Sequence, residues 1–232
     1  MPRENPDSCG FDKCILCRSC DAVWVEAIAQ NRKVFHYEKG QPIFTEGEAI
    51  HGLYFVYNGA VKIHQRWAPG NEFILRFAVA GDVLGHRAQG AGSASPVSAT
   101  TLERTTICYL DHAFLEAVSN ANPLFVRMMM QLYATELQKA EKRMRALATM
   151  PVKSRVAEAL FVLRQVFGAD TQGYCRIPVT RIDIASYAGT TYEAVFRLLT
   201  AWTREGLVTT TGKKIRIDEK EKLTALIQPS TL

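Results

Sequence analysis

The chain has 232 residues, which is more than one domain usually holds, so the length predicts two compact domains with a shared connecting element. Hydrophobic residues make up 47% of the chain and charged residues 22%, and no run approaches the roughly 18 to 20 apolar residues that span a bilayer. The first residues contain no apolar stretch of signal-peptide length, so we expect a cytoplasmic protein with no membrane partner.

The formal net charge of +5 is unevenly distributed along the chain. Residues 1–120 hold 11 Lys and Arg against 13 Asp and Glu, whereas residues 121–232 hold 17 against 10. The first half therefore carries −2 and the second half +7. A basic half suits a polyanionic partner, although ordinary solvated helices explain the charge alone equally well.

A short amphipathic helix is predicted over residues 21–31, with Asp21 as its cap. After it the apolar period changes to two, and turn-forming residues separate short runs rich in β-branched and aromatic side chains. These runs cover residues 34–37, 52–57, 60–67, 72–79 and 105–110. Many short strands at this spacing predict a sandwich, barrel or jelly roll over residues 21–120, and an α+β chain as a whole.

After Asp111 the pattern becomes helical, first to Ser119 and then from about Pro123 to Ala148. Some 25 helical residues reach roughly 37 Å, which is longer than a small domain needs. We therefore expect residues 121–149 to connect two domains and to pair with a second copy in a homodimer. A long helix packed on its own sheet is the alternative. Met150-Pro151 breaks the helix, and a C-terminal domain over residues 150–232 follows.

The C-terminal domain contains a predicted helix-turn-helix. After a helix over about residues 152–167, a short helix covers residues 181–188 and a second covers 192–202. The residues that cap or end these helices are Thr180, Gly189 and either Thr190 or Thr191. A basic hairpin, with strands at 207–209 and 214–217, then forms a wing.

Four residues lie on the exposed N-terminal part of the second helix, where a recognition helix meets base edges. Arg197 can donate a fork to guanine N7 and O6, and Glu193 can accept from cytosine N4. Tyr192 or Phe196 can touch a thymine methyl or brace the DNA backbone. The further candidate DNA-binding residues are Thr180, Arg181 and, for phosphate contact, Lys213 and Lys214. A solvated Glu-Arg pair on an ordinary helical hairpin is the alternative.

Three features together resemble the cyclic-AMP-receptor and fumarate-nitrate-reduction (CRP/FNR) regulators: Gly-Asp-Val-Leu-Gly at 81–85, the long helix, and the sequence at 179–199. The resemblance implies a double-stranded β-helix or jelly-roll sensor domain like those that bind cyclic nucleotides, a dimerisation helix, and a winged helix that binds palindromic double-stranded DNA. It also implies RNA polymerase as a partner. In the family, the residues matching Glu193 and Arg197 read bases in each half-site, whereas Phe196 replaces a residue that is often small.

The family's nucleotide-binding members carry a Gly-Glu pair for the ribose and an Arg-Ser or Arg-Thr pair for the cyclic phosphate. This chain has Gly85-His86 at the first place and Ser95-Pro96-Val97-Ser98 near the second. Without the carboxylate and the guanidinium, a cyclic phosphodiester would lack its main polar partners. The sequence therefore argues against cyclic AMP as the ligand.

The N-terminal segment, residues 1–20, is rich in cysteine, with Cys9, Cys14, Cys17 and Cys20. In a cytoplasmic chain such a cluster indicates a metal site more often than disulfides. The last three match the core of a ferredoxin-type run, which needs a fourth ligand. Cys9 can supply it locally, but the resemblance points to Cys108, because oxygen-sensing members join three N-terminal cysteines to one in the corresponding strand.

The preferred site is thus Cys14, Cys17, Cys20 and Cys108 with a [4Fe-4S] cluster, with Cys9 as an alternative ligand. The resemblance implies that oxygen or nitric oxide destroys the cluster and weakens DNA binding. The alternatives are a four-Cys zinc site, redox thiols without metal, and a haem-based regulator. An iron-sulfur or zinc enzyme is disfavoured, because the histidines are scattered and no catalytic triad or phosphate loop is evident.

Overall fold

The computed structural model describes residues 14–68, 70–88 and 94–227. The chain divides into two compact units, one formed by residues 1–65 and 77–137 and the other by residues 66–76 and 138–232. In the described ranges, every helix is too short or too polar to cross a membrane.

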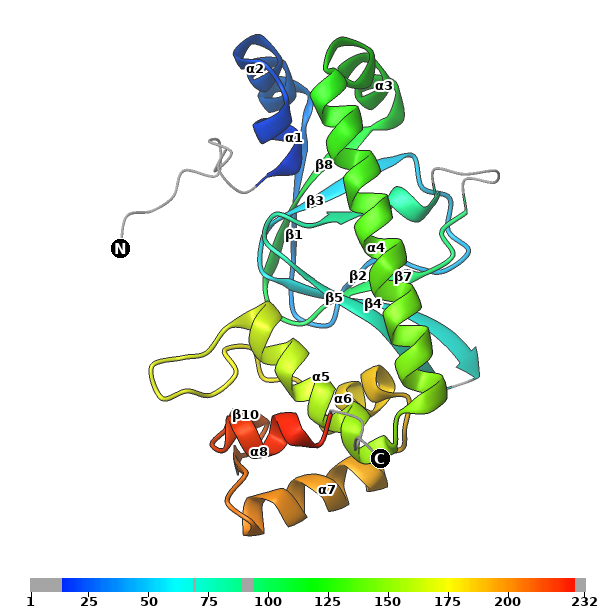
Figure 1. Ribbon diagram of the computed structural model, residues 1–232. Helices are drawn as coiled ribbons and strands as arrows, with labels where there is room; N and C mark the ends of the chain where they lie inside the picture. Colours follow the sequence, from blue (N-terminus) through cyan, green and yellow to red (C-terminus); the bar gives the residue numbers. More distant parts are fainter. Residues whose placement is uncertain (1–13, 69, 89–93, 228–232) are drawn as a thin grey trace. The chain divides into compact units, whose positions relative to one another are not determined.

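Two four-stranded sheets form a β-domain (Figure 1), which belongs to the first unit except for residues 66–76, at the end of β4 and in most of β5, which belong to the second. Their strand orders are β1-β8-β3-β6 and β2-β7-β4-β5. The strands are β1 (Lys33–Tyr37), β2 (Pro42–Phe44), β3 (Gly52–Asn58), β4 (Ala60–Ala68), β5 (Asn71–Val79), β6 (Val83–Leu84), β7 (Ser98–Thr101) and β8 (Thr105–Asp111). Neighbours in each sheet come from distant parts of the chain, as in a jelly roll. The predicted β-domain is confirmed, and each of the five predicted runs lies within a strand.

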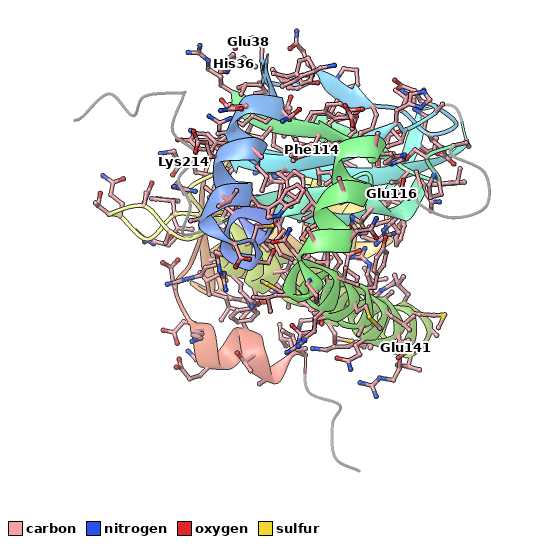
Figure 2. All side chains as sticks on the ribbon, turned by 90° about the horizontal axis from the view of Figure 1, so that it is seen from above. His36, Glu38, Phe114, Glu116, Glu141 and Lys214 are labelled. Atoms are coloured by element: carbon pink, nitrogen blue, oxygen red, sulfur yellow. The ribbon has the colours of Figure 1, made fainter. Side chains whose placement is uncertain are left out.

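Helices cover one face of the β1-β8-β3 sheet. They are α1 (Ile15–Ser19), α2 (Ala22–Asn31), α3 (His112–Ala121) and the first turns of α4 (Pro123–Thr149). Leu53 and Phe55 of β3 and Leu110 of β8 point into an apolar cluster shared with these helices. Trp24 of α2 and Phe114 of α3 close its rim with ring centroids 6.2 Å apart, and Figure 2 shows Phe114 between the two helices.

The ends of these helices follow from a few polar residues. The Asp111 carboxylate accepts the N–H of Phe114 at the start of α3, and Pro123 occupies the first position of α4, where its missing N–H costs nothing. Asp21 stands at the N-cap of α2 as predicted, but its side chain makes no capping bond. Its backbone N–H instead donates to Asn122 Oδ1 at 3.3 Å.

The second unit contains the predicted helix-turn-helix and wing. Its elements are α5 (Val152–Phe167), α6 (Arg181–Ala188), α7 (Tyr192–Arg204), β9 (Val208–Thr211), β10 (Lys214–Ile217) and α8 (Lys220–Ala225). Val195, Leu199 and Trp202 form the buried face of α7, because they recur at helical spacing. The two strands of the wing are antiparallel, with Lys214 opposite Thr211, so the turn between them is shorter than predicted.

Arg143 connects three elements of the second unit. Its guanidinium lies 3.7 Å from the Tyr187 ring centroid in α6 and 4.9 Å from that of Phe73 in β5. It also donates to the backbone carbonyls of Ile74, at 2.9 Å, and Tyr187. A cation between two aromatic faces and two carbonyl oxygens holds the β5 backbone and α6 on the last turns of α4.

Replacing Arg143 should destabilise this unit. Arg143→Ala removes two stacking contacts and two charge-assisted hydrogen bonds, so we expect a loss of about 2–4 kcal/mol and a melting temperature lower by several degrees. Circular dichroism melts measure the shift. Arg145→Ala, at an exposed position two residues away, is the matched control and should melt like the wild type. Equal melting of the two variants would contradict this role of Arg143.

Candidate nucleic-acid interface and metal site

Helix α6 begins with a capping box. The Thr180 hydroxyl accepts the Asp183 N–H at 3.1 Å and donates to Asp183 Oδ2, while that carboxylate accepts the Thr180 N–H at 3.3 Å. These bonds satisfy N–H groups that a helix start leaves without intrahelical partners. The structure therefore gives the Thr180 hydroxyl a capping role inside the protein, and a DNA contact by Thr180 stays a prediction.

The turn between α6 and α7 depends on Gly189. Its φ of +62° lies in the left-handed region, and a Cβ there would meet Leu147 Cδ2 at 2.7 Å. Glycine alone avoids both the strain and the clash. Of the two predicted caps of α7, Thr191 takes the role, because its side chain accepts the Ala194 N–H at 3.3 Å.

Four predicted DNA-reading residues form two adjacent rows on the exposed side of α7. Tyr192 and Phe196 make one row and Glu193 and Arg197 the other, since residues four apart share a helix face. The Tyr192 and Phe196 rings stack with centroids 6.1 Å apart and an interplanar angle of 23°. The guanidinium of Arg181, at the start of α6, lies 5.9 Å from the Phe196 ring centroid.

The wing has a neighbouring segment that the sequence analysis missed. Residues 169–175 form a tight turn that bridges to β10 through Tyr174 and Arg216. The Asp170 carboxylate accepts the backbone N–H groups of Gln172 and Tyr174 at 3.0 Å each. The sequence Asp-Thr-Gln-Gly at 170–173 is a turn signal that sequence reasoning could have used.

The two wing lysines are therefore not equivalent. Lys213 is exposed at the tip, whereas Lys214 Nζ lies 3.5 Å from Asp170 Oδ2. Partial desolvation acts to raise the pKa of Asp170, but the N–H groups of Tyr174 and Gln172 and the Lys214 ammonium outweigh it and lower that pKa. Asp170 thus stays ionised at neutral pH, and a phosphate bound by Lys214 would compete with it. Arg216 is likewise paired, with Nε 2.6 Å from Asp218 Oδ1.

The four preferred metal ligands border one apolar cluster. Cys14 is the N-cap of α1, Cys17 lies within it and Cys20 follows it. Cys17 and Cys108 belong to the buried cluster beneath α1–α4, and Cys14 and Cys20 pack against it. Cys108 reaches this cluster because it stands in β8 opposite Val34 and Phe55, whose side chains share its face of the sheet. Cys9 lies outside the described residues.

The chemistry of this donor set fits an iron-sulfur cluster or zinc, because both take thiolate ligands and buried surroundings exclude water. Cys14 and Cys20 lie at the two ends of α1 with extended backbone, and Cys17 lies between them within the helix. Within the described ranges no three or more His, Cys, Asp or Glu side chains converge on a common metal position. Binding by all three would thus require the turn of α1 to rearrange.

Burial raises the pKa of Cys20, and this effect outweighs the opposing hydrogen bond with Ser19; the nearby Cys14 and Asp21 raise the pKa further. Cys20 is therefore a protonated thiol at neutral pH in this structure. Because a metal takes the thiolate, binding would release the proton.

Asn122 ties the cysteine segment to the start of α4. Its Oδ1 accepts the N–H of Asp21, the residue directly after Cys20, and its Nδ2 donates to the Val118 carbonyl at 2.9 Å. The Asn122 side chain is buried, so both bonds are shielded from water. Nothing in the sequence pattern pointed to this residue except its position before Pro123.

In the family's nucleotide-binding members, one residue pair binds the ribose and another binds the cyclic phosphate. In this protein, side chains at or near those places form hydrogen bonds and ion pairs within the chain. His86 is buried, with Nε2 3.0 Å from Glu136 Oε2 of α4, and Arg87 Nη2 contacts the same oxygen at 3.0 Å. The Ser98 hydroxyl oxygen accepts the N–H of Glu46 at 2.9 Å. The sequence analysis did not single out Glu136, which contacts the jelly-roll β-domain (the roll) from α4.

Two family models match the chain. Residues 34–122 match the cyclic nucleotide-binding domain, and residues 154–226 match the Crp-like helix-turn-helix domain. Over 193 residues the chain is 30% identical to the fumarate and nitrate reduction regulatory proteins of Escherichia coli strain K12 and Salmonella typhimurium. In both cases the alignment covers 82% of this chain and 76% of the relative.

Solved structures share the architecture. FixK2 from Bradyrhizobium japonicum superposes with a TM-score of 0.75 and 25% identity, over 86% of this chain and 99% of that one. The c-di-GMP responsive global regulator CLP from Xanthomonas campestris also gives a TM-score of 0.75, over 85% of this chain and 99% of that one. Its 20% identity indicates a shared fold alone.

Proposed function

Because the chain belongs to the CRP/FNR family of DNA-binding transcription regulators, we propose that it binds palindromic DNA as a homodimer under the control of an iron-sulfur cluster. The observation that carries the proposed control is that Cys14, Cys17, Cys20 and Cys108 border one apolar cluster. That cluster includes the first turns of α4. RNA polymerase is the partner expected of a transcription regulator.

A seam on α4 supports the homodimer. Apolar residues recur along one face at alternating intervals of four and three, the spacing of a coiled-coil seam. They are Val126, Met130, Tyr133, Leu137, Ala140 and Met144. Met130 is 67% exposed and Leu137 61%, whereas Phe125 and Met129 on the neighbouring face are buried against the roll. A second α4 would remove the exposed face from water.

A charge in the middle of this seam should break the dimer. Leu137→Glu would bury one carboxylate from each protomer, so we expect the dimer dissociation constant to rise roughly 100-fold or more. Gln138→Glu adds the same charge one residue away, off the seam, and should leave the dimer intact. Sedimentation equilibrium measures both. A wild-type monomer, or equal behaviour of the two variants, would contradict pairing through α4.

DNA reading is assigned to the exposed side of α7. Arg197 can donate two parallel bonds to guanine, and Glu193 one turn earlier can accept from cytosine. Lys213 at the wing tip offers a charge for a phosphate, and Lys214 offers a second in competition with Asp170. Glu193 and Arg197 would determine which DNA sequence is bound, whereas Lys213 and Lys214 would affect only the affinity.

Arg197→Ala should cost roughly 1–3 kcal/mol of binding free energy at one base pair of each half-site. Lys213→Ala should weaken binding to all sequences alike and reduce the slope of log affinity against log salt by about one. Fluorescence anisotropy with single-base operator variants at several salt concentrations distinguishes the two. A uniform loss from Arg197→Ala would mean that the recognition helix is wrongly assigned.

The proposed ligands of the cluster are Cys14, Cys17, Cys20 and Cys108, with Cys9 as the alternative. A bound [4Fe-4S] cluster would supply a crosslink between strand and N-terminal segment that oxygen or nitric oxide can destroy. The protein's own contribution is the bond from Asp21 N–H to Asn122, which holds the cysteine segment beside the start of α4. Any change in that segment therefore acts on the helix that carries the dimer seam.

Protein purified without air tests the proposed control. We expect four iron and four acid-labile sulfide per protomer, as the cluster formula requires, and a loss of DNA affinity in air of roughly 5- to 150-fold. Cys108→Ser should lose the iron, while Cys175→Ser, on the other unit, should keep it. Stoichiometric zinc with air-insensitive DNA binding would contradict the proposal, and so would a haem Soret band.

Cyclic AMP does not fit the engaged positions in the roll. His86 stands where the family's ribose-binding carboxylate would be, and it is buried and paired with Glu136. The run at residues 95–98, near the place of the family's phosphate-binding pair, contains no guanidinium, and its Ser95, Val97 and Ser98 are buried. The match of residues 34–122 to the cyclic nucleotide-binding domain thus reflects the architecture of a sensor domain whose input lies elsewhere.

A further inference from the structure

Two aromatic rings stand exposed on a helix whose other large apolar residues are mostly buried. Tyr192 is 44% exposed and Phe196 49%, whereas Val195, Leu199 and Trp202 of the same helix are almost completely buried. Exposed apolar surface of this kind is unfavourable in water and commonly marks an interaction site. These rings adjoin Glu193 and Arg197, so the proposed base-reading face of α7 is half charged and half apolar.

The Phe196 ring is held from two sides. Tyr192 stacks on it with centroids 6.1 Å apart, and the Arg181 guanidinium lies 5.9 Å from its centroid. A side chain with only two rotatable bonds, packed in this way, presents its free edge in a defined direction at little entropic cost. The arrangement is therefore suited to a specific contact.

The chemistry of the ring limits what it can recognise. A phenyl group has no donor or acceptor for a phosphate or for the polar edges of guanine, cytosine or adenine. In the major groove only thymine presents an apolar group, its C5-methyl. Because Phe196 and Arg197 are neighbours on the exposed side of α7, we expect the base that Phe196 meets to lie beside the pair that Arg197 reads.

We propose that Phe196, positioned by Tyr192 and Arg181, recognises a thymine methyl in each operator half-site, beside the G·C pair read by Glu193 and Arg197. This inference rests on the proposed DNA binding through α7, and it specifies thymine as the base that the row of Tyr192 and Phe196 recognises. The operator should therefore contain an A·T pair at that position, with its thymine methyl facing the ring.

The test begins with the full-length protein, kept from air, and operators that it enriches from a pool of random duplexes. Each thymine of one enriched half-site is replaced in turn by deoxyuridine, which removes the methyl group and leaves the base pairing unchanged. One replacement should weaken binding about fourfold, the effect expected for about one methyl group of lost burial. The others should have little effect.

Variants of the aromatic row assign the effect. Phe196→Ala should bind the thymine and deoxyuridine operators equally, whereas Tyr192→Phe keeps the stack and should retain the wild-type ratio. Circular dichroism confirms that each variant is folded. The thymine assignment would be overturned if no deoxyuridine replacement weakened wild-type binding, or if the ratio of affinities for the thymine and deoxyuridine operators were unchanged in Phe196→Ala. Either result would leave the proposed DNA binding intact. Failure to enrich any operator would contradict the proposed DNA binding itself, and this inference with it.

Discussion

One helix, α4, has two apolar faces, one packed on the roll and one exposed. The other features of the protein depend on how the helix is held between these two roles. Phe125 and Met129 are buried against the roll, while Met130 and Leu137, on the adjacent face, remain exposed. Three polar side chains hold the helix at successive points along its length. Asn122 accepts a backbone hydrogen bond beside the cysteines, and Glu136 contacts His86 and Arg87. Arg143 lies between aromatic rings of β5 and α6. Because these bonds are directional and largely buried, they determine which face of α4 is left for a partner. A rotation of the helix that exposed Met129 would also break the contact between Glu136 and His86.

The parts of the fold that sequence reasoning predicted well are those with strong local signals. Runs of β-branched and aromatic residues between turn signals specified β3 and β8, the Met150-Pro151 break set the end of α4, and Thr180 and Gly189 set the limits of α6. The missed elements, among them β2, β6 and β7, are only two to four residues long, and such segments form because long-range pairing partners exist. Thr100 of β7, for example, pairs with Lys62 of β4 on one side and with Pro42 of β2 on the other. These partners are far apart in the sequence, so no short stretch of sequence contains both members of a pair.

The candidate sites show the same limit. Tyr192, Glu193, Phe196 and Arg197 could be assigned to one exposed helix face because helical periodicity alone places them there. Their stacking, and the position of Arg181 over Phe196, depend on how α6 meets α7. Similarly, Cys14, Cys17 and Cys20 were evident from spacing, whereas Asp170 beside Lys214 and Asn122 beside Asp21 join residues more than forty positions apart. Such pairs decide which charges and backbone groups remain available, and they come only from tertiary structure.

In the proposed control, the cysteine segment and α4 act as one element through Asn122. Hydrogen exchange of the full-length protein, with and without exposure to air, measures this coupling directly in peptides covering residues 14–22 and 122–137. We expect protein kept from air to exchange slowly in both peptides, and air to accelerate exchange in both together while the β8 peptide, residues 105–110, changes little. Faster exchange confined to residues 14–22, with α4 unaffected, would contradict the coupling.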